Sequence, residues 1–266
     1  MSKKSFTYSV KTMGCKANIY DSLVIERQLT EIGGVRASGE SPDLFVVNSC
    51  TVTAEADRQS LREISQIKKR SPDTVTVVTG CLSQVDPEKV AQSPGVELVI
   101  PNDKKQNFKS IIANKLGFEF TESEEDSEIF WGQLPTQQGK TRAFLKIQEG
   151  CNDYCTYCII PYARGKSRSV RLGQIISEVQ RLVTVNGIQE VVLTGTNIGD
   201  YGKDFGHCLE DLIEAILDKT TLPRLRLTSL DPSEITERIL TIMAAPQSRL
   251  MPHLHVSLQS PVSRVL

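Results

Sequence analysis

Three of the seven cysteines lie close together with the spacing CxxxCxxC, as Cys151, Cys155 and Cys158. Thiolates are the usual ligands of iron–sulfur clusters, and three thiolates at this spacing can bind three irons of a cubane. Because a fourth nearby cysteine is missing, one iron would stay open to a small ligand. The alternative is a zinc site, but structural zinc normally takes four protein ligands. The spacing therefore favours an open [4Fe–4S] cluster.

The cysteines Cys15, Cys50 and Cys81 are far apart in the sequence, yet each closely follows a predicted strand. In parallel sheets the carboxyl ends of the strands share one edge, where such folds bind ligands. The three thiols are therefore expected to converge and to hold a second cubane with one open iron. Redox-sensing thiols or plain buried thiols remain the alternatives. The three strands are expected at 5–11, 43–48 and 74–80.

The elements that must position the cysteines alternate between strand and helix in both halves of the chain. In the first half, a further strand is expected at 96–100, and helices at 18–32, 54–70, 86–92 and 103–116. In the second half, strands are expected at 142–148, 189–194, 224–229 and 253–258, and helices at 172–186, 208–219 and 233–244. This alternation is typical of βαβ units and parallel sheets.

The stretch 118–140 is acidic and then polar, which is typical of a linker. We therefore expect an N-terminal domain over 1–117, a linker over 118–140 and a second domain over 141–266. The second domain has four βα-type units without a closing set, as in a partial barrel. The CxxxCxxC motif follows its first strand, and barrel active sites lie beyond the carboxyl ends of strands.

Composition narrows the class of protein. With 39% hydrophobic and 24% charged residues, the 266-residue chain resembles a globular protein rather than a disordered one. No apolar run reaches the roughly 18 residues that span a bilayer, and the N-terminus lacks a signal-peptide core. We expect a cytoplasmic protein without a membrane partner. The net charge is −1, so any RNA contact must come from local patches.

One such patch is the run of Arg164, Lys166, Arg168 and Arg171, which follows the cysteine motif. Lysine and arginine supply most nonspecific attraction to nucleic acid, so phosphate contact is physically sensible. A solvated basic face is equally ordinary. The seventh cysteine, Cys208, fits neither set and is expected to be a small buried residue.

The segments around the cysteines resemble the bacterial radical S-adenosylmethionine (SAM) methylthiotransferase family in their order and separation. They are GCKAN (14–18), NSCTVT (48–53), TGCLSQ (79–84) and EGCNDYCTYCIIPYARG (149–165). The resemblance implies an α/β protein, with an N-terminal open parallel-sheet methylthiotransferase domain followed by a partial radical SAM (β/α) barrel. It also implies two [4Fe–4S] clusters and SAM as cofactors.

The resemblance assigns the two cysteine sets different roles. Cys151, Cys155 and Cys158 would bind the cluster that cleaves SAM and would be the catalytic cysteines. The set formed by Cys15, Cys50 and Cys81 would hold an auxiliary cluster that carries the sulfur. One SAM would methylate that sulfur, and a second would provide the radical that abstracts hydrogen from C2 of an adenine.

The residues GCKxN, YARG and SLQS look most like the branch that modifies N6-threonylcarbamoyladenosine beside the anticodon of tRNA. The branches for isopentenyladenosine in tRNA and for an aspartate of a ribosomal protein are the rivals within the family. The resemblance implies tRNA, an electron donor such as flavodoxin or ferredoxin, and a sulfur donor as partners.

Polar residues that follow the later strands are candidates for SAM or substrate contact. LTGTN (193–197) matches the position where the family fold contacts the SAM amino group, although it is also an ordinary strand-to-helix turn. The residues after the next two strands could equally cap helices. The candidates are Gly195, Thr196, Asn197, Ser229, Ser257 and Gln259.

Family members continue beyond SLQS through the remaining barrel strands into a small RNA-binding β-barrel, the TRAM domain. Here SLQS is followed only by PVSRVL. We therefore expect a second domain that is incomplete at its C-terminus, and no TRAM domain. The rival from another functional class is an inactive Fe–S binding or electron-transfer module, which SAM binding would discriminate.

Overall fold

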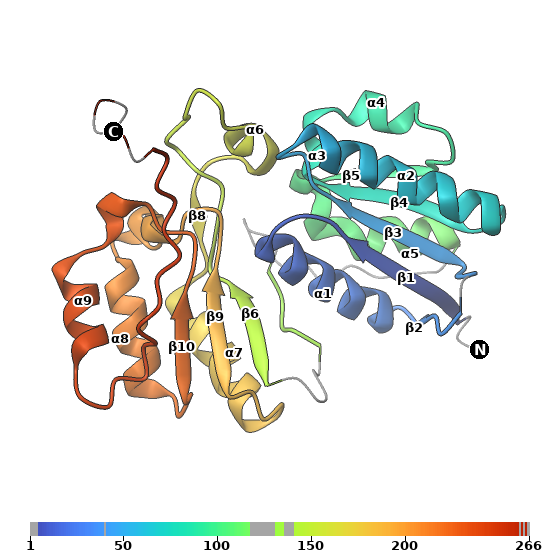
Figure 1. Cartoon of the computed structure of the whole chain (residues 1–266). Helices are drawn as coiled ribbons and strands as arrows, with labels where there is room; N and C mark the ends of the chain where they lie inside the picture. Colours follow the sequence, from blue (N-terminus) through green and yellow to red (C-terminus); the bar gives the residue numbers. More distant parts are fainter. Residues whose placement is uncertain are drawn as a thin grey trace. The chain divides into compact units, whose positions relative to one another are not determined.

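The computed structural model describes residues 5–39, 41–117, 131–135, 141–260, 262 and 264. The chain divides into two compact units, each with its own parallel sheet (Figure 1). The first unit comprises Met1–Pro135 and Asp153–Gly165, and the second comprises Thr136–Asn152 and Lys166–Leu266. The expected linker at 118–140 lies mostly outside the described residues. No helix in the described part is long and apolar enough to cross a membrane.

The first unit is built on a five-stranded sheet in the order β2-β1-β3-β4-β5. All four strand pairs are parallel. The central strand reads LFVVNS and is buried throughout, as expected for a parallel strand covered on both faces. The short β2 was not predicted from the sequence. The strands are β1 (Phe6–Thr12), β2 (Gly34–Arg36), β3 (Leu44–Ser49), β4 (Val75–Gly80) and β5 (Leu98–Pro101).

Helices connect these strands in the first unit (Figure 1). The long α2 begins at the cap Thr53, whose hydroxyl accepts from the Ala56 N–H, and it ends in basic residues that complement the helix dipole. The helices are α1 (Lys16–Glu31), α2 (Ala54–Arg70), α3 (Cys81–Val85), α4 (Pro87–Ala91), the 3-10 helix η1 (Asn102–Asn107), α5 (Phe108–Leu116) and α6 (Ile160–Arg164).

The described end of the expected linker, 131–135, packs on the first unit. The Tyr20 hydroxyl donates to the Gly132 carbonyl at 2.8 Å, and Arg27 Nη1 donates to Gln133 Oε1 at 2.9 Å. Leu134 is fully buried. These residues are therefore part of the α1 packing surface.

The second unit contains a parallel sheet in the order β10-β9-β6 and a short antiparallel pair, β7-β8. The strands are β6 (Arg142–Lys146), β7 (Gln148–Glu149), β8 (Arg168–Ser169), β9 (Glu190–Thr194) and β10 (Arg224–Leu227). The helices are α7 (Leu172–Thr184), α8 (Leu209–Lys219) and α9 (Glu237–Ala244), with the 3-10 turns η2 (Ile198–Asp200), η3 (Lys203–Phe205) and η4 (Pro232–Glu234). The α/β prediction is confirmed for both units.

The fourth strand predicted in the second unit, 253–258, is wrong. Within this segment, the described residues form one isolated bridge, between Val256 and Leu230, which follows β10. A second bridge, Leu225↔Leu250, joins β10 to a residue before the segment. Pro252 has no N–H to give to a ladder, and the next N–H, of His253, bonds locally to the Met251 carbonyl. The segment bonds to Leu230 through the His255 carbonyl and the Ser257 N–H, but it does not continue into a ladder with β10.

Candidate functional site

The first candidate site lies at the carboxyl edge of the five-stranded sheet. Cys15 is the N-cap of α1, Cys50 directly follows β3, and Cys81 is the first residue of α3 after β4. Strands β1, β3 and β4 are neighbours in the sheet. The prediction that Cys81 lies in a loop is wrong in detail, because β4 passes directly into a helix at Gly80. The topology nevertheless brings all three cysteines to one edge.

The three thiols are close enough to influence one another. Burial raises the pKa of the Cys50 thiol, and the neighbouring thiols of Cys81 and Cys15 raise it further. Cys50 and Cys81 are 5% and 2% exposed, whereas Cys15 is exposed, so the group is buried on one side and open on the other. Among the described residues, no group of such side chains is spaced to hold a single metal ion. A cubane is larger than one ion, so its ligands must stand further apart.

Two glycines allow the backbone to approach these cysteines. Gly14 has φ +88°, and a Cβ there would lie 2.6 Å from Cys50 Sγ. Gly80 has φ +98°, and a Cβ there would collide with the Ser49 backbone. Both backbone conformations favour glycine. The glycines in the GCK and TGC segments therefore have a steric role beside the thiols.

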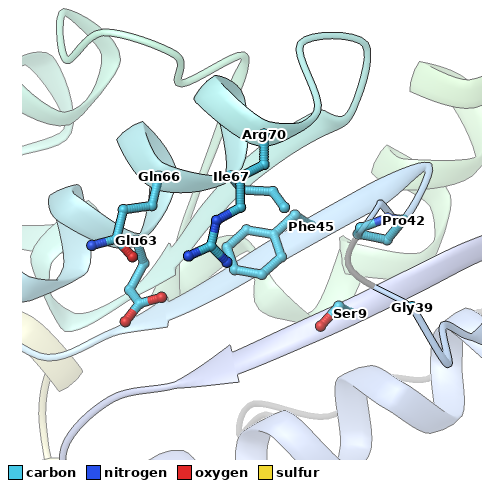
Figure 2. Close-up of a pocket in the computed structure, with 8 residues that line it drawn as sticks. All are labelled: Ser9, Gly39, Pro42, Phe45, Glu63, Gln66, Ile67 and Arg70. Atoms are coloured by element: carbon cyan, nitrogen blue, oxygen red, sulfur yellow. The ribbon is translucent and has the colours of Figure 1, made fainter.

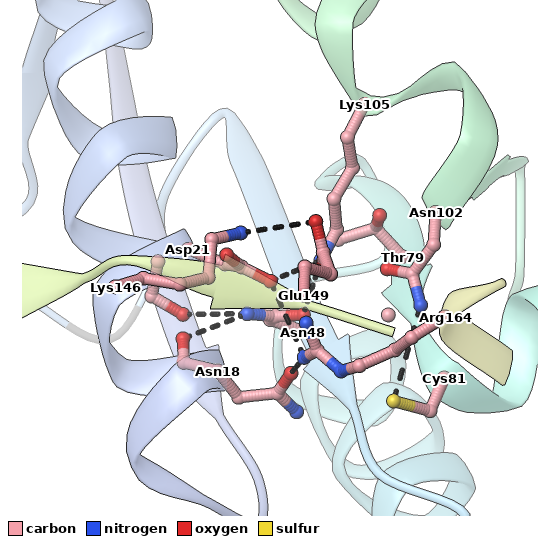
Figure 3. Close-up of polar contacts among 12 residues, drawn as sticks. Asn18, Asp21, Asn48, Thr79, Cys81, Asn102, Lys105, Lys146, Glu149 and Arg164 are labelled. Carbon is pink, nitrogen blue, oxygen red and sulfur yellow. Dashed lines mark hydrogen bonds and ion pairs between the residues drawn. The ribbon is translucent and has the colours of Figure 1, made fainter. Parts of the chain in front are cut away.

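A buried polar network lies behind this edge (Figure 3). Asn18 Nδ2 donates to the carbonyls of Met13 and Ser49, at 2.7 and 2.9 Å, so it holds the backbone before Cys15 and before Cys50. Asn48 Nδ2 donates to the Asn18 carbonyl at 3.0 Å. Both amides are fully buried. The asparagines of the GCKAN and NSC segments thus fix the loops that carry the cysteines.

Three charged side chains are buried in the same network (Figure 3). The ammonium of Lys105 lies 3.0 Å from Asp21 Oδ2, and Arg164 Nη2 lies 3.4 Å from the same oxygen. Arg164 Nη2 also donates to Asn18 Oδ1 at 2.5 Å. All three side chains are at most 1% exposed. Sequence reasoning missed Asp21 and Lys105, for which spacing gave no signal.

The positive charge of Arg164 lowers the pKa of Cys50, against the larger effect of burial. Asn102 adds a neutral donor: its Nδ2 lies 3.9 Å from Cys81 Sγ and 2.7 Å from the Ala163 carbonyl. This edge therefore places one buried cation and one neutral hydrogen-bond donor beside the thiols.

The CxxxCxxC segment is divided between the two units. Cys151 follows β7 in the second unit, whereas Cys155 and Cys158 precede α6 in the first. Within the first unit, the Cys158 N–H donates to the Cys155 carbonyl at 2.9 Å. Cys155 is exposed, and Cys151 and Cys158 are half-buried. The grouping of these three thiols on one cluster remains a prediction from their spacing.

At the carboxyl edge of the second sheet, Gln148 organises the loop at 195–197. Its Oε1 accepts the N–H groups of Thr196 and Asn197 at 3.1 and 2.9 Å. Its Nε2 donates to the Gly150 carbonyl at 2.7 Å and to Ser167 Oγ at 2.9 Å. The side chain is fully buried. Gln148 thereby links the predicted SAM loop to the residue before Cys151.

Gly195, Thr196 and Asn197, the predicted SAM residues, form this loop. A Cβ at Gly195 would lie 2.7 Å from the Gln148 carbonyl, so only glycine fits. Thr196 Oγ1 accepts the Gly150 N–H at 3.3 Å. Asn197 Oδ1 is buried without a hydrogen-bond partner within the described part of the chain. An unpaired buried acceptor is typical of a site that a ligand completes.

Ser229 joins this loop, but Ser257 and Gln259 have no hydrogen bond to 195–197 among the described residues. The Ser229 carbonyl accepts the Ile198 N–H at 3.2 Å, and its backbone has φ +58°. Ser257 and Gln259 are exposed and bond to each other, from Gln259 Nε2 to the Ser257 carbonyl. The whole set of SAM contacts remains a prediction.

Comparison with known proteins gives the family. Residues 7–101 match "Uncharacterized protein family UPF0004", and residues 145–266 match the Radical SAM superfamily. The threonylcarbamoyladenosine tRNA methylthiotransferase MtaB of Aquifex aeolicus (strain VF5) is 36% identical over 96% of this chain and 63% of its own length. The protein of the same name from Bacillus subtilis (strain 168) is 33% identical, over 98% of this chain and 59% of its own length.

The chain is similar to radical SAM methylthiotransferases over nearly its whole length. Another relative, the tRNA-2-methylthio-N(6)-dimethylallyladenosine synthase of Paenarthrobacter aurescens (strain TC1), is 35% identical over 98% of this chain. The chain covers only 52% of that relative, and less than two thirds of the other two. The family resemblance predicted from the cysteine segments is thus confirmed.

A solved structure supports the fold of the chain. The radical SAM methyltransferase TsrM from Kitasatospora setae, solved with cobalamin and a [4Fe–4S] cluster, aligns with a TM-score of 0.63 at 15% identity. The alignment covers 96% of this chain and 59% of that one. The predicted fold class, an N-terminal parallel sheet followed by a radical SAM domain, is confirmed. The match to the Radical SAM superfamily and the similarity to these methylthiotransferases imply SAM and [4Fe–4S] clusters as cofactors.

The basic residues after the cysteine motif lie in different environments. Arg164 is buried and hydrogen-bonded in the first unit, so it fits neither a phosphate contact nor a solvated basic face. Lys166 and Arg171 are exposed, and Arg171 stacks over the Phe205 ring at 4.6 Å. Cys208, expected to be buried, is only half-buried, because it is the N-cap of α8.

A separate pocket in the first unit is unrelated to the cysteines (Figure 2). It has a volume of about 170 Å³ and lies between α2 and the strands β1 and β3. One of its lining residues, Pro42, lies just before the start of β3. The cysteines, by contrast, lie just after the carboxyl ends of the strands. Its lining is Ser9, Gly39, Pro42, Phe45, Glu63, Gln66, Ile67 and Arg70. No cysteine lines it, so it offers no ligand for a cluster.

Proposed function

We propose that the protein is a tRNA methylthiotransferase that adds a methylthio group to C2 of N6-threonylcarbamoyladenosine next to the anticodon. One observation supports this above the others. Cys15, Cys50 and Cys81 meet at one sheet edge in a chain that also carries the CxxxCxxC motif. An electron-transfer cluster needs no open iron. Here each set of three cysteines would leave one iron of its cluster open. The relatives named for threonylcarbamoyladenosine favour that substrate branch.

The residues of the first site fit an iron–sulfur cluster. The thiols of Cys15 and Cys81 are close enough to act on that of Cys50, a buried guanidinium also acts on Cys50, and an amide lies beside Cys81. We infer that Cys15, Cys50 and Cys81 hold an auxiliary cluster and that Cys151, Cys155 and Cys158 hold the second. With SAM bound, these cofactors would supply radical methylthiolation. The chain's own contribution at the first edge is to bury Cys50 and Cys81 and to place the charge of Arg164 and the amide of Asn102 beside the thiols.

The residues at the second sheet edge fit SAM. Gln148 holds the loop at 195–197 in one conformation, and Asn197 Oδ1 is an acceptor in need of a donor. The SAM amino group is such a donor. We therefore assign Asn197, with the backbone at Gly195 and Thr196, to SAM binding. Ser229 would support this loop through its carbonyl.

The proposed reaction defines the partners. A tRNA substrate places the enzyme in the cytoplasm, and the exposed Lys166 and Arg171 can contact its phosphates. Radical chemistry of this type also requires an electron donor, such as flavodoxin or ferredoxin. Repeated turnover requires a sulfur donor. These partners follow from the reaction and not from any contact in the structure.

The substrate is tested in a strain that lacks the gene. Nucleosides from its tRNA are analysed by mass spectrometry, with complementation by the native gene and by Cys50→Ala and Cys155→Ala variants. We expect loss of the methylthio derivative of N6-threonylcarbamoyladenosine, restored only by the native gene. Loss of methylthio-isopentenyladenosine instead would assign the protein to the other tRNA branch, whose relative is 35% identical. Unchanged tRNA would contradict a tRNA substrate.

The cofactors are tested by anaerobic reconstitution, with iron and sulfide analysis and SAM cleavage to 5′-deoxyadenosine. We expect about eight irons, falling by about half in Cys15→Ala or Cys151→Ala, since each set would hold one four-iron cluster. Cleavage should be lost in Cys151→Ala and retained in Cys15→Ala. Clusters without SAM cleavage would favour the inactive electron-transfer alternative.

A further inference from the structure

We propose that Arg164 is a positioning residue for the auxiliary cluster and that its buried charge raises the reduction potential of that cluster. The inference rests on the proposed function only in requiring a cluster at Cys15, Cys50 and Cys81. It gives a role to an arginine that the sequence placed in a basic run without deciding its function.

The guanidinium is held in place by groups that also hold the cysteine loops. Arg164 Nη2 donates to Asn18 Oδ1 at 2.5 Å. The amide nitrogen of the same asparagine donates to the carbonyls of Met13 and Ser49, the backbone before Cys15 and before Cys50. One buried side chain thus connects the arginine to two of the three cysteine loops. A shift of Arg164 must displace Asn18 or break that hydrogen bond.

The backbone beside Arg164 is linked to the third cysteine. Asn102 Nδ2 donates to the Ala163 carbonyl at 2.7 Å and lies 3.9 Å from Cys81 Sγ. Helix α6 also packs on α3, which begins at Cys81. The end of α6 is therefore tied to all three cysteine positions within the first unit.

The charge of Arg164 acts on the site because it is buried. Its side chain is 1% exposed, and its charge interacts with Cys50. Reduction adds one negative charge to a cluster that already carries thiolates. A nearby cation stabilises that added charge, more strongly in a medium of low dielectric than in water. Net charge and hydrogen bonds to sulfur are known to set the potentials of Fe–S clusters.

The same network supplies internal controls. Asp21 binds both cations through Oδ2, so its charge opposes that of Arg164. Lys105 binds that oxygen at 3.0 Å and Asn48 Oδ1 at 3.3 Å, whereas Arg164 reaches Asn18 beside the cysteine loops. Substitutions of the three residues therefore change the charge in different directions and at different places.

The test is an anaerobic redox titration of the full chain followed by electron paramagnetic resonance. A parent carrying Cys155→Ala and Cys158→Ala leaves only the auxiliary cluster. We expect Arg164→Met to lower the midpoint potential and Asp21→Asn to raise it. Arg164→Lys keeps the charge and should stay close to the parent. Lys105→Met should lower the potential by less than Arg164→Met.

Opposite shifts from Arg164→Met and Asp21→Asn exclude a merely structural role, because disorder would move both variants alike. Equal shifts of the midpoint potential in Lys105→Met and Arg164→Met would overturn the inference. An unchanged potential in Arg164→Met, or in Asp21→Asn, would also overturn it. If Arg164→Met takes up no cluster, the sign of the Asp21→Asn shift decides. A parent without a cluster would overturn the cofactor assignment itself, whereas a parent with one and unmoved potentials overturns this inference alone.

Discussion

The carboxyl edges of the two sheets are organised in different ways. At the first edge, three charged side chains and two asparagines form a buried network behind the thiols. At the second edge, the single neutral side chain of Gln148 holds the loop at 195–197. A charged network resists rearrangement because breaking any part leaves a buried charge. The first edge is thus rigid before any cofactor binds, and the second depends on one residue.

The largest expected effect comes from breaking the charged network. Asp21→Ala removes the carboxylate that contacts both Lys105 and Arg164. We expect the free energy of unfolding to fall by about 4 kcal/mol, since removing one partner of a buried ion pair typically costs that much. Chemical denaturation of the reduced chain measures the change. Asp73→Ala, on an exposed turn, is the control and should stay within about 0.5 kcal/mol. A similarly small effect of Asp21→Ala would contradict the rigid-edge interpretation.

The next effect tests the single residue at the second edge. Gln148→Ala removes four hydrogen bonds and leaves the N–H groups of Thr196 and Asn197 without their acceptor. We expect a loss of about 3 kcal/mol, the upper range for leaving buried groups unsatisfied. Calorimetry should also show weaker SAM binding. The matched control is Gln189→Ala, whose exposed amide bonds only to the Gly187 carbonyl. Unchanged SAM binding in Gln148→Ala would show that the loop does not depend on it.

The convergence of Cys15, Cys50 and Cys81 could be predicted from the sequence, because a predicted strand precedes each of them and parallel strands share an edge. The surroundings of the thiols could not. Arg164 stands in a run of cations that reads as a surface, and only the packing of α6 shows that it is buried. Asp21 and Lys105 are 84 residues apart, so no local pattern connects them.

The position of Gln148 in the sequence gives a weak indication of its role. A glutamine at the end of an apolar strand, three residues before a cysteine, needs a buried partner for both its donor and its acceptor. The segment 253–258 shows the reverse error. The alternation of its residues predicted a strand, but the described segment forms only an isolated bridge at Val256. The residue pattern does not encode the backbone hydrogen bonds that a strand requires.

A smaller effect tests how tightly the second edge is packed. In Gly195→Ala the new methyl group would meet the Gln148 carbonyl and its Oε1, at 2.7 and 2.9 Å. We expect a loss of about 2 kcal/mol from overpacking, measured by thermal unfolding. Gly173 lies in α7, where an added methyl group would have no atom within 4 Å, so Gly173→Ala should stabilise the chain by about 0.5 kcal/mol. A neutral Gly195→Ala would mean that the loop can move aside.

The smallest expected effect needs no substitution. It compares how fast individual thiols are modified in the reduced, cluster-free chain. Cys155 is exposed, whereas Cys50 and Cys81 are 5% and 2% exposed. Iodoacetamide should therefore modify Cys155 at least about tenfold faster, as peptide mass spectrometry would show. Because burial raises the pKa of Cys50, its thiolate fraction at pH 8 is below that of an ordinary thiol, and its modification should speed up as the pH rises further. If Cys50 reacted as fast as Cys155 at pH 8, the first edge would be open without its cluster, and the contrast between the two edges would fail.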